Sequence, residues 1–184
     1  MTEHELKKAL ADELKSAGLA PYIVRDKSQV LEVSEGFFVE MVLNDGSKLG
    51  DAENLIGSIR AKMQSHGVQI ISVLRAVWSV KEVERIGPSR GKSGGIKTSV
   101  DFRAILESGR RETEVVIEVG DLALKELRER LGSDDKVLDA VEDFLRLQLS
   151  WGGAGYWDPV RYPRQILNEA AILYLRTHQS VTAA

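Results

Sequence analysis

A glycine-rich basic stretch contains the residue types of a phosphate-binding loop. Gly87-Pro-Ser-Arg-Gly-Lys-Ser93 places Gly-Lys-Ser after an earlier glycine, and P-loops cradle phosphates with backbone amides and a lysine. A P-loop needs four residues between its first glycine and Gly-Lys-Ser, whereas three stand here, and it opens a helix. The residues that follow, 96–106, alternate as a strand does. The pattern therefore favours a surface hairpin loop over a nucleotide site.

The same loop offers cations for a less specific contact. Arg90, Lys92 and Lys97 lie close together in the sequence and could meet an anion or nucleic-acid phosphates without reading bases. The whole chain carries a net charge of −3, which argues against general nucleic-acid binding. Anion binding by this loop is therefore kept as an alternative, and nucleic acid is not expected as a partner.

The second candidate is an aromatic segment from Trp151 to Arg164. It holds two of the three tryptophans and two of the four tyrosines, beside several glycines. Glycines permit close backbone approach and these rings suit a ligand wall or an interface, but they also serve as pegs that seal helices onto a domain. The candidate interface or pocket residues are Trp151, Tyr156, Trp157, Asp158, Arg161, Tyr162 and Arg164.

An enzymatic interpretation of this segment is a hydrolase-like site near Tyr156, Asp158 and Arg161. Asp158 precedes a proline and is also a typical turn residue, and Arg161 or Arg164 could pair with it or with an acidic ligand. The sequence contains neither a Gly-x-Ser-x-Gly elbow nor a cysteine nucleophile. Catalytic residues therefore cannot be assigned, and a non-catalytic protein is favoured.

Metal and cofactor sites are not expected. The three histidines, His4, His66 and His178, are isolated in the sequence, and His66 is explained by the favourable dipole at a helix end. There is no cysteine to hold zinc or iron, and no Gly-x-Gly-x-x-Gly follows a strand.

Three strands are expected to position both candidates. Residues 68–81, 97–106 and 112–119 each alternate apolar and polar side chains, as half-buried antiparallel strands do. A two-residue turn at Ser108-Gly109 joins the last two, and Phe102, Val115 and Ile117 are expected in the core. Burial sets the register, because a slip of one residue would expose the whole apolar row.

Helices and a hairpin complete the expected fold, which is α+β with a mostly antiparallel sheet of about five strands and about five helices. A domain at 1–132 is expected to carry the sheet, with an all-helical C-terminal extension at 133–184 packed as part of it. The hairpin is predicted at 30–33 and 37–43, and the helices at 3–17, 51–66, 121–131, 133–149 and from Pro163.

The composition indicates the cytoplasm. The absence of cysteine fits a reducing compartment, and the N-terminal residues alternate charge with leucine, unlike a signal peptide. No run approaches the ~18 apolar residues of a membrane span.

The leading hypothesis is a non-catalytic binding or assembly module that engages a protein partner or a second copy of itself. It would use the aromatic segment or the second sheet face, which is more apolar than a solvated face needs to be and carries Ile71, Val73, Val77, Ile105 and Val116. A two-fold dimer would cover that face. The competing explanation is a monomer in which the helices from 133 to 178 cover it.

Overall fold

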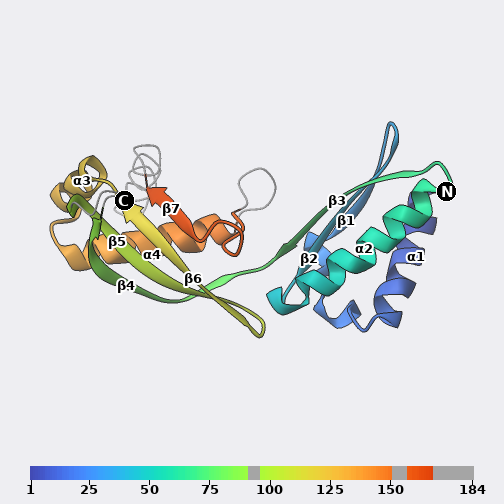
Figure 1. Cartoon of the computed structure of the whole chain (residues 1–184), viewed down its shortest axis with the longest axis horizontal. Coiled ribbons are helices and arrows are strands. Elements are labelled where there is room, and N and C mark those ends of the chain that lie inside the picture. The colour runs from blue at the N-terminus through green and yellow to red at the C-terminus, as the bar shows by residue number, and fades with distance from the viewer. Residues whose placement is uncertain (91–95, 151–156, 168–184) are drawn as a thin grey trace. The chain divides into compact units, whose positions relative to one another are not determined.

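The computed structural model describes residues 1–90, 96–150 and 157–167, which form an α+β fold (Figure 1). Within these ranges there are four α-helices, and seven strands form two mixed, mostly antiparallel sheets. The predicted α+β fold class is confirmed. The prediction of a single sheet of about five strands was wrong, because three strands form one sheet and four form another.

The chain divides into two compact units. The first contains residues 1–78 and 108–111, and the second contains 79–107 and the chain from 112 onward. Each sheet lies in one unit, apart from strand ends at the hairpin turn. The domain boundary expected at residue 132 stays a prediction.

The first unit packs two helices on a three-stranded sheet. Helix α1 (Glu3–Ser16) precedes an antiparallel hairpin of β1 (Gln29–Val33) and β2 (Gly36–Leu43). Helix α2 (Leu49–Gln64) then leads to β3 (Gln69–Ala76), which pairs with β2 in parallel. Three short 3-10 helices lie in the connections, η1 (Ala20–Tyr22), η2 (Arg25–Lys27) and η3 (Gly46–Lys48).

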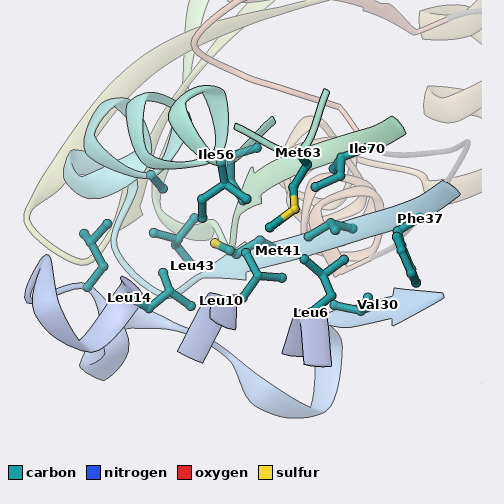
Figure 2. Close-up of a cluster of buried hydrophobic side chains, with 14 residues drawn as sticks. Leu6, Leu10, Leu14, Val30, Phe37, Met41, Leu43, Ile56, Met63 and Ile70 are labelled. Atoms are coloured by element: carbon teal, nitrogen blue, oxygen red, sulfur yellow. The ribbon is translucent and has the colours of Figure 1, made fainter. Parts of the chain in front are cut away.

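One face of this sheet forms the core of the first unit. The leucines of α1 recur every four residues, so they line one side of the helix. They meet the alternate, odd-numbered residues of β2 and the apolar side of α2, as Figure 2 shows. The buried cluster includes Leu6, Leu10, Leu14, Phe37, Val39, Met41, Leu43, Ile56, Met63 and Ile70.

In its described residues, the second unit has a four-stranded sheet and two α-helices. Its strands are ordered β4 (Ser79–Arg90), β5 (Ile96–Ser108), β6 (Arg111–Val119) and β7 (Arg164–Leu167). Helices α3 (Asp121–Leu131) and α4 (Asp134–Ser150) pack against each other, and α4 packs on β4. Phe102, Val115 and Ile117 are buried, as predicted.

The strand predicted at 68–81 is two strands in two sheets. Residues 69–76 pair with β2, whereas residues 79–90 pair with β5. Val77 and Trp78 lie between them, and the Val77 amide donates to the Leu43 carbonyl. Apolar residues alternate through the break, so the pattern alone predicted one strand.

The prediction of a helix from Pro163 was also wrong for its first residues, which form β7 in the structure. Residues 164–167 pair in parallel with β6, and the Val116 amide donates to the Pro163 carbonyl. Pairing with a strand edge satisfies backbone groups there and outweighs a helical spacing of apolar residues. The remainder of that prediction, after residue 167, lies outside the described residues.

A buried carboxylate holds the β5–β6 turn within the first unit. Asp45 Oδ1 accepts hydrogen bonds from the Ser47 amide (2.9 Å), the Ser47 hydroxyl (2.6 Å) and the Arg110 amide (3.2 Å). The Gly46 amide donates to the Ser108 hydroxyl at 2.9 Å. The turn residues are Gly109 and Arg110, one position later than predicted, because β5 extends through Ser108.

Glycine at 109 should be essential to this turn. Its φ is +60°, and a Cβ would lie 2.3 Å from Asp45 Cγ. Gly109→Ala should therefore lower the free energy of unfolding through backbone strain of about 1–2 kcal/mol and a clash of about 1–3 kcal/mol. Gly132→Ala is the control, since Gly132 has φ +82° but nothing within 4 Å of its Cβ position. If urea unfolding showed that Gly109→Ala and Gly132→Ala lower the free energy of unfolding equally, the packing of Gly109 on Asp45 would be contradicted.

Asp45 should also make stability depend on acid. Burial by itself raises the pKa of Asp45, but hydrogen bonds from Ser47 and Arg110 hold it below its ordinary value. The stabilisation is therefore complete above about pH 4 and is lost as the pH falls through the lower folded pKa. Asp45→Asn should reduce stability at pH 7 and flatten this acid dependence in urea unfolding at several pH values. The exposed Asp26→Asn is the control, and an unchanged acid profile in Asp45→Asn would refute this role.

Candidate functional site

Two of the aromatic-segment residues have structural roles in the second unit. Trp157 is buried, and its Nε1 donates to the Tyr162 carbonyl at 2.7 Å. Asp158 Oδ1 accepts hydrogen bonds from the amides of Val160 (3.0 Å) and Arg161 (3.3 Å). This geometry favours the peg interpretation for Trp157 and a turn role for Asp158.

The two arginines point to different partners. Arg161 lies over the exposed ring of Tyr162, 5.7 Å from its centroid. Arg164 Nη2 donates to Glu118 at 2.6 Å and to Asp101 at 3.3 Å. The hydrogen bond to Glu118 is the main reason that the pKa of Arg164 lies above its usual value. Arg164 therefore binds the strand carboxylates and ties the start of β7 to the sheet.

The aromatic segment does not gather its described polar groups around one point. Asp158 is satisfied by its own turn, whereas Arg164 is held by two strands. Trp151 and Tyr156 lie outside the described residues. The pocket or interface and the hydrolase-like site in this segment therefore stay predictions.

The described residues on both sides of the basic loop pair as antiparallel strands. β4 and β5 pair as far as Arg90 and Ile96, and a strand follows the Gly-Lys-Ser motif where a P-loop would have a helix. Lys92 lies outside the described residues. Anion binding by Arg90, Lys92 and Lys97 stays a prediction.

An apolar patch on the first sheet has the clearest character of a binding surface. Both helices of the first unit pack on the opposite face, and part of this second face is exposed. Four of these side chains have exposed fractions of 40% to 59%, and Phe38 is half-buried between them. We define the sheet-1 patch as Leu31, Val33, Phe38, Ile71 and Val73.

The strand register makes this patch continuous. Leu31 of β1 lies opposite Phe38 of β2, which lies opposite Ile71 of β3, so one apolar row crosses the whole sheet. Val33 and Val73 flank that row on the two edge strands. Monomeric proteins seldom expose a contiguous apolar surface without a use for it.

A neutral ion pair borders the patch. Arg75 Nε donates to Glu40 Oε1 at 3.1 Å, and Gln29 Nε2 donates to Glu40 Oε2 at 2.9 Å. The side chains of Arg75 and Glu40 are only 10% and 13% exposed. The charges of Arg75 and Glu40 compensate each other at this part of the border.

The sequence identified part of this surface. Ile71 and Val73 were predicted on an apolar second face and lie in the patch. Ile105 and Val116, predicted beside them, belong to the other sheet, and Val77 lies between β3 and β4. Leu31, Val33 and Phe38 were missed, although their alternation with the buried Val30 and Phe37 was a usable signal.

The sheet-1 patch consists of four aliphatic side chains and one phenylalanine. Its side chains carry no group that titrates or acts as a nucleophile, and the described residues hold no group of three or more His, Asp or Glu side chains that could ligate a metal.

None of the helices within the described ranges has the length and hydropathy needed to cross a membrane. Comparison with protein-family models, curated proteins and solved structures finds no match for this chain.

The peg role of Trp157 can be measured. Trp157→Ala should lower the free energy of unfolding by about 3–5 kcal/mol, because it removes a buried ring and leaves the Tyr162 carbonyl without its donor. Tyr162→Ala should change it by no more than about 0.5 kcal/mol, since that ring is 55% exposed. Chemical denaturation compares the two variants. Equal, small effects would return Trp157 to the list of interface candidates.

Proposed function

We propose that this protein is a non-catalytic assembly module of the cytoplasm that forms a two-fold dimer through the sheet-1 patch. The observation that carries the proposal is the apolar row Leu31–Phe38–Ile71, which spans all three strands of an open sheet face. Covering such a row removes apolar surface from water, which is the main driving force of association.

The chemistry of the patch favours a second copy over a charged partner. A two-fold interface places the same surface on both sides, so apolar side chains meet apolar side chains. The Glu40–Arg75 pair is already neutralised at the border, and it would not repel its symmetry mate strongly. A partner of opposite charge would instead need an unbalanced charge around the patch.

The size of the patch predicts a weak dimer. Stable complexes commonly bury about 800 Å² on each partner, whereas the patch has five side chains, one of them half-buried. A small interface of this kind dissociates on dilution. Association should therefore depend on concentration in the micromolar range or above.

Analytical ultracentrifugation tests this proposal. The protein should move from a monomer of 20.4 kDa toward twice that mass as its concentration rises. Ile71→Arg places a charge in the central row and should keep the protein monomeric, and the 59% exposure of Ile71 allows the variant to fold. Circular dichroism confirms the fold of each variant.

Leu122→Arg is the matched control. Leu122 is 69% exposed and lies on α3 in the second unit, so the same substitution there adds the same charge without changing a residue of the patch. This variant should associate as the natural sequence does. A monomer at every concentration, or association that Ile71→Arg leaves unchanged, would overturn the proposal.

A further inference from the structure

The first unit contains a cleft on the other side of its sheet from the patch. The cleft has a volume of about 600 Å³, within the ~300–1,000 Å³ range of small-molecule sites. It lies where α1, the segment from Ala20 to Ser28 and the start of β1 meet, and Val39 and Met41 of β2 form part of its wall.

The inner surface of this cleft is aliphatic. Leu10 and Leu14 come from α1, Ile23 from the connecting segment and Val30 from β1. Neither a tryptophan nor a tyrosine lines it, so stacking with an aromatic ligand has no partner there. A flexible alkyl chain matches these walls better than a planar ring does.

The outer surface carries more free cations than carboxylates. Lys7 is paired with Glu3 at 2.5 Å, and Glu40 is bound by Arg75 and Gln29. Lys15 and Arg25 have no ion-pair partner among the described residues, and Asp12 is the remaining carboxylate that lines the cleft. The outer surface of the cleft would therefore attract a ligand with an anionic head group.

We infer that this cleft binds an aliphatic carboxylate, with the alkyl chain against Leu10, Leu14 and Val30 and the carboxylate near Lys15 and Arg25. The ligand class follows from the pairing of an aliphatic wall with two unpaired cations. This site does not depend on the sheet-1 patch or on self-association, since it uses different residues of the same unit.

Decanoate is the probe, followed by amide chemical shifts in NMR below its micelle-forming concentration. Saturable one-site binding is expected, with the largest shifts at cleft residues such as Ala11 and Val30. Decanol, which has the same chain without the charge, should bind at least about fivefold more weakly. The double variant Lys15→Gln/Arg25→Gln should weaken decanoate binding about five- to tenfold and leave decanol binding unchanged.

A pair of alanine substitutions locates the site. Ala11→Phe fills the cleft from an exposed position on α1 and should abolish binding, whereas Ala61→Phe, at an exposed position on α2 outside the cleft, should preserve it. The absence of saturable binding would overturn the inference. So would binding that survives Ala11→Phe and is lost in Ile71→Arg, because the chain would then occupy the sheet-1 patch.

Discussion

The one-sided packing of the first sheet is the constraint from which the other features of that unit follow. Side chains alternate between the two faces of a strand, and both helices cover the face that carries Phe37, Val39 and Met41. The residues between them, Phe38 and Glu40, must then lie on the other face. This second face carries apolar residues at one end and the Glu40–Arg75 ion pair, whose charges compensate each other, at the other.

The Asp45 corner shows how a single buried charge is kept in such a unit. Three donors surround Asp45 Oδ1, so the carboxylate gains in hydrogen bonds what it loses in hydration. One donor comes from Arg110, 65 positions away in the sequence. The residues of this contact are Asp45, an acceptor, and Gly109, which alone fits the space beside it. The contact explains why position 45 is an aspartate and position 109 a glycine. From the sequence alone, however, neither residue predicts the other.

Local patterns predicted the elements well and their partners poorly. Leucine spacing located α1, and alternation located β2, β5 and β6, because each depends on residues close together in the sequence. Alternation could not reveal that β3 and β4 belong to different sheets, although 14 residues was long for one strand. β7 was missed because parallel pairing with β6 is a contact between distant segments. The candidate surface followed the same rule. Alternation can assign Leu31, Phe38 and Ile71 to one face of their strands, but only the strand register shows that they form a single row.

The two proposed binding surfaces share one strand and can still be separated. On β2, Val39 and Met41 line the cleft, whereas Phe38 lies in the patch. Glu40 is common to both, because it lines the cleft and also accepts from Arg75 at the border of the patch. The bond from Arg75 holds the Glu40 carboxylate at the border of the patch, so substitutions of the patch residues and of Lys15 and Arg25 change one surface at a time.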